Sequence, residues 1–478
     1  MRDYLLLYVN GKELRIGGAD AFKTLSNFLR YDQQKTGTKI VCEEGDCGAC
    51  TVLVGRVENG EIVYKPINSC IQFMYQLDCA HIVTIEGLRA DGELNAVQES
   101  MIKCHGAQCG YCTPGFVVAM CAMFEQKDSV TVPEVQDALT GNLCRCTGYD
   151  SIIQAALDVD TSKLTRMRQL YPSEAMIIAF TKQRSVPVRI EADGRKYLNP
   201  VDLLTAVKFK SDNPETVIVA GATDVGVYCN KRGFEPAVVM SLSNIEGLCE
   251  LRVENGSLIV GAKTSLAALE EFVGELIPEL YNILWTFGGP GIKHAGTLAG
   301  NIANGSPIAD TLPMLFVMDA EIEVQGLSGK RCIKVGSLYK GYKTLDLKPE
   351  EIITRIVIPI PKNGETLKLY KISRRKNLDI SAFTAAILMT RHGNTIASIR
   401  IAYGGVGPVV VRLPKTEAFL SGQEYKLETF KNAGEVAREE ISPISDVRGS
   451  AAFRNRLAEN MLVKFFYETA DEREFVCQ

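Results

Sequence analysis

The feature that most constrains this chain of 478 residues is a pair of cysteine quartets in its first third. The first quartet, in the segments CEEGDCGAC and NSC, comprises Cys42, Cys47, Cys50 and Cys70. The second, in QCGYC and LCRC, comprises Cys109, Cys112, Cys144 and Cys146. Eight thiols at short, regular spacings indicate either a disulfide framework or ligation of metal.

A disulfide framework is typical of short secreted chains. Here the N-terminal segment MRDYLLLYVNGKELRI alternates like a strand and lacks the apolar stretch of a secretion signal. The longest apolar run, 116–124, is far shorter than the roughly 20 residues of a membrane span. A net charge of −4 with mixed signs indicates neither nucleic acid nor an anionic membrane as a partner. We therefore expect a cytoplasmic protein whose cysteines ligate metal.

The first quartet has the spacing C-x4-C-x2-C with a remote fourth cysteine, which is the pattern of plant-type [2Fe–2S] ferredoxins. A loop around such a centre has to turn its backbone N–H groups toward the sulfurs. Gly45 and Gly48 lie inside the loop and permit that turning. A zinc site is the alternative, although zinc sites more often pair two short C-x2-C units.

The second quartet is less simple. Cys104, Cys109 and Cys112 repeat the C-x4-C-x2-C spacing, so spacing alone lets Cys104 compete with Cys144 or Cys146 as a ligand. One intervening residue leaves Cys144 and Cys146 too close for an unstrained disulfide. A C-x2-C unit plus a C-x-C unit supplies four ligands without Cys104. Spacing leaves a four-cysteine zinc site open here as well.

In their order, CEEGDCGACTV, QCGYCTPGF and GNLCRCTGY resemble the two-cluster domains of the molybdenum hydroxylases, the family of xanthine dehydrogenase and aldehyde oxidase. The resemblance implies a plant-type ferredoxin domain followed by a four-helix bundle that holds a second [2Fe–2S] cluster. The bundle's ligands are then Cys109, Cys112, Cys144 and Cys146, which leaves Cys104 without a role. The resemblance also implies that Gln108 lies near the molybdopterin of a partner.

Two glycine-rich segments follow, VIVAGATDVG (217–226) and AGTLAGNIANGSPIADTLP (295–313). Each runs from a predicted strand into a turn whose backbone N–H groups can bind a pyrophosphate, although two ordinary β-turns are the alternative. The Rossmann and Walker glycine motifs are absent from the sequence. As a pair, the segments resemble the FAD-binding domain shared by xanthine dehydrogenases and vanillyl-alcohol-type flavoproteins.

This resemblance implies a set of FAD contacts. The first pyrophosphate loop comprises Val219, Ala220, Gly221, Ala222, Thr223, Asp224 and Val225. The second loop uses Thr297, Gly300 and Asn301. Asp310 is assigned to the ribityl or adenosine side of FAD, and Phe287 to stacking near the isoalloxazine ring. Ile353 and Lys371 are assigned to the ring and its polar edge. Asp379 is assigned to the nicotinamide side. Ala220 and Ala222 depart from the family, whose members often carry glycine or asparagine there.

The predicted fold is a multidomain α+β protein. We expect a β-grasp ferredoxin domain over 1–83, a helical iron–sulfur domain over 84–165 and a linker over 166–188. An α+β FAD-binding domain over 189–364 and a C-terminal α/β flavoprotein subdomain over 365–478 complete the chain.

The four histidines, His81, His105, His294 and His392, lack any spacing to a carboxylate or nucleophile, so we expect no catalytic residue on this chain. The chain ends where a molybdenum domain begins in single-chain relatives. The resemblance therefore implies a molybdopterin-binding large subunit as partner, in a heterodimer or a dimer of heterodimers.

In this interpretation electrons pass from molybdopterin through both clusters to FAD and then to NAD, during oxidation of hypoxanthine or xanthine to urate. An aldehyde, N-heteroaromatic or acyl-CoA hydroxylase is the alternative. An alternative from a different functional class is a zinc-stapled interaction protein, in which the cysteines bind structural zinc and no electrons are transferred.

Overall fold

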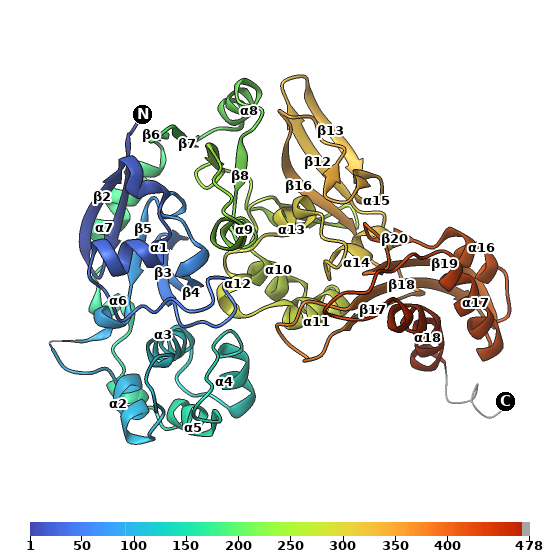
Figure 1. Cartoon of the computed structure of the whole chain (residues 1–478), viewed down its shortest axis with the longest axis horizontal. Helices are drawn as coiled ribbons and strands as arrows, with labels where there is room; N and C mark the ends of the chain where they lie inside the picture. Colours follow the sequence, from blue (N-terminus) through green and yellow to red (C-terminus); the bar gives the residue numbers. More distant parts are fainter. Residues whose placement is uncertain (91, 471–478) are drawn as a thin grey trace. The chain divides into compact units, whose positions relative to one another are not determined.

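A computed structural model describes residues 1–90 and 92–470 of the chain (Figure 1). These residues form two compact units. The first comprises 1–246 and 288–296, and the second comprises 247–287 together with the chain from 297 onward. In the described ranges, every helix is too short or too polar to cross a membrane. The predicted α+β architecture is confirmed, while the domain boundaries stay predictions.

The first unit begins with a five-stranded mixed sheet in the order β2-β1-β5-β3-β4. Its strands are β1 (Tyr4–Val9), β2 (Lys12–Gly17), β3 (Thr51–Glu58), β4 (Glu61–Asn68) and β5 (Ala80–Val83). Asn10 and Gly11, which join β1 to β2, both have positive φ angles of 48° and 79°. This is the backbone of a type I′ turn, so the Asn-Gly pair closes the hairpin. The sheet is the expected β-grasp ferredoxin domain.

Four helices follow: α2 (Ala96–Lys103), α3 (Thr113–Phe124), α4 (Val132–Ala138) and α5 (Asp150–Leu157) (Figure 1). Helix α3 is apolar on nearly every face and forms the buried centre of the group, as its sequence predicts. Helix α4 begins with a capping box, in which Glu134 Oε2 accepts from Thr131 N at 2.8 Å.

The segment 166–188, expected as a linker, contains α6 (Met167–Leu170) and α7 (Glu174–Arg184). Met176 and Phe180, one helical turn apart on α7, are buried against the outer face of the ferredoxin sheet. The buried guanidinium of Arg2 donates to Asp78 and to the backbone oxygen of Gln183 near the end of α7. The segment therefore packs onto the first domain rather than spanning open space.

The rest of the first unit is a smaller layer in which strands and helices alternate. Its sheet has the order β6-β7-β9-β8, with β7, β9 and β8 parallel. The elements are β6 (Val188–Ala192), β7 (Arg195–Asn199), α8 (Leu203–Asp212), β8 (Val217–Val219), α9 (Val225–Arg232) and β9 (Val238–Ser241). Helix α12 (Pro290–Lys293) belongs to the same unit.

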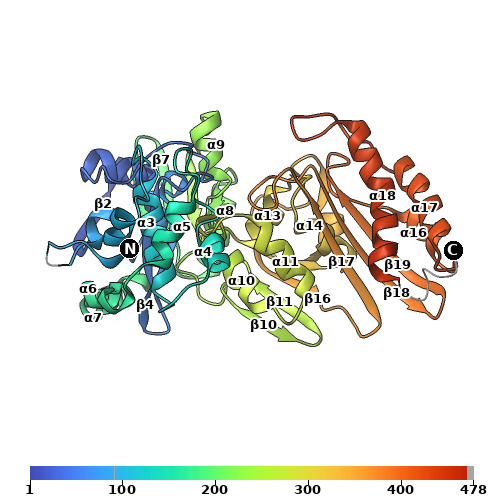
Figure 2. The ribbon, with the colours of Figure 1, turned by 90° about the horizontal axis from the view of Figure 1, so that it is seen from below.

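The second unit contains two antiparallel sheets. One has the order β10-β11-β16-β12-β13, from β10 (Leu251–Glu254), β11 (Ser257–Gly261), β12 (Glu321–Gly326), β13 (Gly329–Lys334) and β16 (Ile352–Pro359). The other joins β17 (Glu365–Ile372), β18 (Phe383–His392), β19 (Thr395–Gly404) and β20 (Val411–Arg412). Along the second sheet lie α16 (Pro414–Leu420), α17 (Leu427–Glu439) and α18 (Ala451–Thr469) (Figure 2). The short hairpin β14 (Tyr339–Gly341) and β15 (Thr344–Leu345) stands apart from both sheets.

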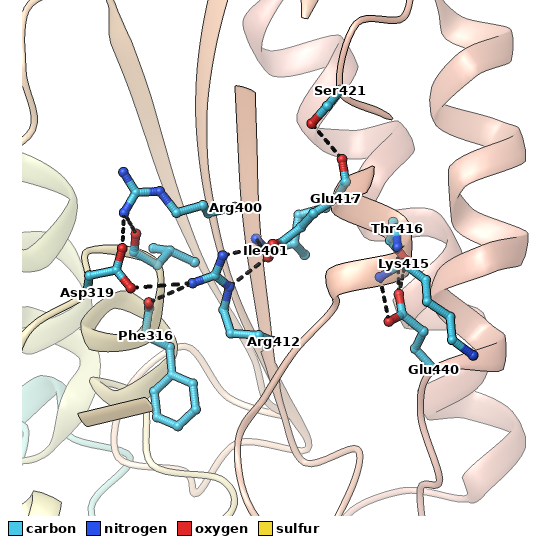
Figure 3. A network of polar contacts seen from close by, with 11 residues as sticks. Phe316, Asp319, Arg400, Ile401, Arg412, Lys415, Thr416, Glu417, Ser421 and Glu440 are labelled. Carbon is cyan, nitrogen blue, oxygen red and sulfur yellow. Dashed lines mark hydrogen bonds and ion pairs between the residues drawn. The ribbon is translucent and has the colours of Figure 1, made fainter. Parts of the chain in front are cut away.

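Two arginines, on β19 and β20 of the second sheet, bind the C-terminal end of α14 (Leu312–Val317), as Figure 3 shows. Arg400 Nη1 donates to Val317 O at 2.9 Å and pairs with Asp319 at 2.6 Å. Arg412 donates to Phe316 O at 3.2 Å and binds Glu417 through two hydrogen bonds of 2.7 and 2.8 Å. Both guanidinium groups thus satisfy carbonyls at the C-terminal end of α14, where a positive charge is favourable.

The ferredoxin sheet contains a histidine whose titration should make folding depend on pH. His81, on β5, is fully buried; its Nε2 accepts from Gly11 N at 3.0 Å, and its Nδ1 lies 2.7 Å from Tyr64 Oη. Burial lowers the pKa of His81 to about 4, whereas an exposed histidine has a pKa of about 6.5. Between these two pKa values the histidine is protonated in the unfolded chain but neutral in the folded chain, so a falling pH favours unfolding.

We therefore predict that His81 reduces the free energy of unfolding of this domain by about 1.4 kcal/mol between pH 7.5 and pH 5.5. Hydrogen exchange of β1 and β5 at both pH values measures this loss. His81→Gln cannot take up the proton, so its pH-dependent loss should be smaller by that amount. An equal loss in both proteins would contradict the assignment.

Candidate functional site

The first quartet comes together at one end of the ferredoxin sheet. Cys42, Cys47 and Cys50 lie in the loop 42–50 before β3, and Cys70 follows directly after β4. The thiol of Cys42 contacts those of Cys47 and Cys70, and Cys50 contacts Cys70. Because these thiols share hydrogen bonds, the contacts lower the pKa of Cys42 and raise the pKa of Cys47 and of Cys70.

Both glycines of this loop are required by its geometry. Gly45 and Gly48 have φ angles of 75° and 68°. A Cβ atom at Gly48 would lie 2.3 Å from Gly141 O, and one at Gly45 would lie 2.5 Å from Ile71 Cδ1. The loop therefore has no room for side chains at either position.

The second quartet gathers between the N-terminal end of α3 and the loop before α5. The Sγ atoms of Cys109 and Cys146 are 3.5 Å apart, and Cys112 contacts Cys144. Cys104, at the C-terminal end of α2, instead lies near Asp158, with its Sγ 3.9 Å from Oδ2. The structure thus groups the four cysteines that the family resemblance assigned and places Cys104 elsewhere.

In the second quartet the sulfurs meet as two pairs, whereas in the first Cys42 contacts both Cys47 and Cys70, and Cys70 contacts Cys50. A structural zinc ion collects four ligands around one point, whereas the two irons of a [2Fe–2S] centre each take two of four cysteines. Across residues 1–90 and 92–470, no three His, Cys, Asp or Glu side chains converge in the manner of ligands to a single ion. Four cysteine thiols in each group match the donor set of a [2Fe–2S] centre.

Direct backbone contacts join the two cysteine-bearing loops. Leu143 N, next to Cys144, donates to Cys47 O at 2.9 Å. The buried side chain of Asn142 donates from Nδ2 to Gly48 O at 3.1 Å. The ligand loop of one quartet is therefore hydrogen-bonded to the ligand loop of the other.

The first predicted flavin loop, 219–225, lies in the same unit and connects β8 to α9. Gln72 Nε2 donates to Gly221 O at 2.7 Å, and Gln76 Nε2 donates to Ala220 O at 2.9 Å. Ala222 has a φ angle of 57°, a region in which glycine or asparagine is favoured, so alanine strains the loop at this departure from the family.

The loop is also packed tightly on its other sides. A Cβ atom at Gly221 would lie 2.1 Å from Ala295 O, and one at Gly226 would lie 2.6 Å from Ile71 O. Ile71 follows the predicted ligand Cys70 directly, so α9 packs against backbone next to the first quartet. Sequence reasoning missed Gln72 and Gln76; their amides within the otherwise apolar run IQFMYQ were the available signal.

The second predicted flavin loop belongs to the second unit. Thr297 Oγ1 accepts from Gly300 N at 3.0 Å, where α13 (Leu298–Asn304) begins. Asn301 Oδ1 accepts from Thr311 Oγ1 at 2.6 Å. The N–H of Gly300 is therefore hydrogen-bonded within the loop, and Asn301 is hydrogen-bonded to Thr311, the residue after Asp310.

Asp310 and Lys371 form a buried ion pair. Asp310 Oδ2 lies 2.7 Å from Lys371 Nζ, and Oδ1 accepts from Ser381 Oγ. Lys371 Nζ also donates to Thr286 O at 3.2 Å, next to Phe287 at the end of α11 (Pro278–Phe287). The structure thus brings three predicted FAD residues, Asp310, Lys371 and Phe287, into one neighbourhood.

The remaining predicted residues lie apart from these groups. Ile353 is a core residue of β16, and Asp379 pairs with Arg375 at 2.6 Å in the loop between β17 and β18. Gln108 is exposed beside Cys109, itself exposed like Cys146.

Three family models match the chain. The [2Fe-2S] binding domain matches residues 84–157, and the FAD binding domain in molybdopterin dehydrogenase matches residues 190–361. The CO dehydrogenase flavoprotein C-terminal domain matches residues 368–469.

Two curated relatives illustrate the similarity. Xanthine dehydrogenase of Blastobotrys adeninivorans is 30% identical over 97% of this chain and 40% of its own length. Aldehyde oxidase 1 of Bos taurus is 28% identical over 98% of this chain and 39% of its own. The chain thus spans about 40% of the length of these relatives.

Solved structures show the same likeness for the flavoprotein part. Reconstituted CO dehydrogenase from Oligotropha carboxidovorans superposes with a TM-score of 0.54 and 26% identity, covering 56% of this chain and 94% of its own. Quinoline 2-oxidoreductase from Pseudomonas putida 86 gives 0.53 and 25%, covering 57% and 95%. The fold, the cysteine quartets and these matches together identify an iron–sulfur and FAD chain of the molybdenum hydroxylase family.

The placement of the cysteines predicts which thiols are essential. Cys112→Ser should abolish one of two [2Fe–2S] signals in electron paramagnetic resonance (EPR) spectra of the reduced protein, because it removes one of four ligands. Cys104→Ser is the matched control and should leave both signals unchanged. Loss of a signal in the control would make Cys104 a ligand and overturn the assignment.

The buried pair of the second unit predicts a linked loss of stability and flavin. Asp310→Asn leaves the charge of Lys371 without its partner, so the free energy of unfolding should fall by about 3 kcal/mol. Fluorescence of the single tryptophan, Trp285, reports on this unit, and the ratio of flavin to folded protein should fall as well.

Asp319→Asn is the control, since its ion pair with Arg400 is half-exposed and should contribute less than about 1 kcal/mol. Full flavin content in folded Asp310→Asn protein would contradict a role of Asp310 in binding FAD. An unchanged free energy of unfolding would contradict its role in the buried ion pair.

Proposed function

We propose that this chain is the electron-transfer subunit of a molybdenum hydroxylase. A large subunit would hold the molybdopterin and oxidise hypoxanthine or xanthine to urate, with NAD as the final acceptor. Together the matched domains support an oxidoreductase with [2Fe–2S] and FAD cofactors. The xanthine dehydrogenase relatives favour the purine substrate.

One observation carries the proposal: in the first unit the segments that bear the first quartet contact both the second quartet and the first flavin loop. Leu143 N donates to Cys47 O on one side, and Gln72 Nε2, two residues after Cys70, donates to Gly221 O at 2.7 Å on the other. Bound clusters and flavin would supply the one- and two-electron chemistry, which side chains cannot perform. The protein's part is to fix the order and closeness of the three sites.

The exposed end of this arrangement is the proposed entry from the partner subunit. Cys109 and Cys146 are exposed, whereas Cys50 and Cys70 are buried. Tyr111, between the ligands Cys109 and Cys112, is also exposed. An exposed quartet rimmed by an aromatic side chain suits docking of a second protein, as aromatic residues are enriched in interfaces.

The residues proposed to contact FAD fall into two groups, one described within each unit. In the first unit these are the loop 219–225, held by Gln72 and Gln76. In the second they are Thr297, Gly300 and Asn301 with the buried pair of Asp310 and Lys371. Asp379, already paired with Arg375, is proposed on the nicotinamide side.

The substrate class has a second candidate. CO dehydrogenase and quinoline 2-oxidoreductase match the flavoprotein part at 26% and 25% identity, and an aldehyde oxidase matches nearly the whole chain. A heteroaromatic or aldehyde hydroxylase would use this chain in the same way. The residues that select a substrate belong to the partner in this proposal.

The experiment is purification of the chain with its partner subunit, followed by metal analysis and assay. We predict bound FAD with about four iron and four sulfide atoms per chain, as two [2Fe–2S] centres require. Oxidation of hypoxanthine or xanthine should produce urate and reduce NAD. Colourless protein that contains zinc would contradict the electron-transfer role. If purines are not oxidised but aldehydes or heteroaromatics are, only the proposed substrate changes and the electron-transfer role stands.

A further inference from the structure

A side chain on α9 reaches the ligand loop of the first quartet. Asn230 Nδ2 donates to Glu43 O and to Cys70 O, both at 2.9 Å. Cys70 is itself a predicted ligand, and Glu43 follows the ligand Cys42. Helix α9 begins at Val225, the last residue of the first flavin loop. One amide thus ties the flavin segment to two peptide groups of the metal-binding loop.

The first of these peptide groups also faces a ligand sulfur. Glu44 N lies 3.4 Å from Cys42 Sγ and donates a hydrogen bond to it. Because a trans peptide is planar, its C=O and N–H point in opposite directions. By holding Glu43 O on one side, Asn230 directs the N–H of Glu44 toward Cys42 on the other.

The backbone does not adopt this orientation by preference. Glu43 has a φ angle of 56°, in the left-handed region that non-glycine residues avoid. Such a conformation persists where the surroundings hold it in place. The amide of Asn230 and the ion pair of Lys231 with Glu44, at 3.6 Å, are the contacts from α9 that do so.

We propose that Asn230 is a positioning residue that sets the reduction potential of the first [2Fe–2S] centre through the N–H of Glu44. The inference rests on the proposed function, since it requires a two-iron centre on Cys42, Cys47, Cys50 and Cys70. Hydrogen bonds to ligand sulfurs stabilise the extra negative charge of the reduced centre and thereby raise its potential. The helix that follows the first flavin loop therefore tunes the neighbouring electron donor.

The test is a redox titration of the full chain followed by EPR, with Asn230→Leu as the main variant. Leucine has a similar shape but donates no hydrogen bond. The signal lost in a Cys42→Ser protein identifies the first centre. We expect Asn230→Leu to shift that centre to lower potential, with the second centre at its wild-type potential. Asn230→Ala removes the same donor without adding branched bulk and should shift the potential in the same direction.

Asn213→Leu is the matched control. Asn213 Nδ2 also donates to a backbone oxygen, that of Phe209 at 2.9 Å, within the same unit but at the end of α8. This variant should leave both potentials unchanged. A first centre at its wild-type potential in both Asn230 variants would overturn the inference. Wild-type protein without two-iron signals would instead overturn the proposed function, and this inference with it.

Discussion

The backbone of the loop 42–50 is the constraint on which the first unit depends. Three of its carbonyl groups accept from asparagine side chains: Gly45 O from Asn68, Gly48 O from Asn142 and Glu43 O from Asn230. These asparagines lie at the end of β4, in the second-quartet loop and on α9. With its carbonyls held from three sides, the loop is free to present N–H groups to the sulfurs. Three separate segments of the unit thus converge on one short stretch of backbone.

The second unit contains a charged pair that is buried in an apolar interior. Lys371 and Asp310 are both nearly fully buried, and each makes a further hydrogen bond, to Thr286 O and from Ser381 Oγ respectively. Breaking such a pair is costly because one charge stays behind in a medium of low polarity. Asp310 also lies just before Thr311, the N-cap of α14, and the opposite end of this helix is held by Arg400 and Arg412 (Figure 3). The position of the proposed flavin residue is therefore fixed through a helix anchored at its far end.

Much of this arrangement was predictable from the sequence, because some residues have only one plausible local use. The Asn10–Gly11 turn, the capping box of α4 and the buried helix α3 follow from local chemistry. The grouping of Cys109 with Cys146 away from Cys104 did not follow from spacing, since two spacings competed. The packing of α7 was missed because its apolar residues, 175–180, are consecutive and therefore show no helical period that would mark Met176 and Phe180 as the buried face. Contacts such as Gln72 with Gly221 join residues far apart in the chain, and local patterns carry no information on them.

The central claim is that the two cysteine loops are in direct contact and form one continuous path. EPR of the fully reduced protein tests it most directly, because two paramagnetic centres in neighbouring loops split or broaden each other's signals. The account predicts two [2Fe–2S] signals with mutual splitting, and loss of that splitting from the first signal when Cys144→Ser removes the second centre. Two sharp, independent signals, with the first unaltered in Cys144→Ser, would contradict it.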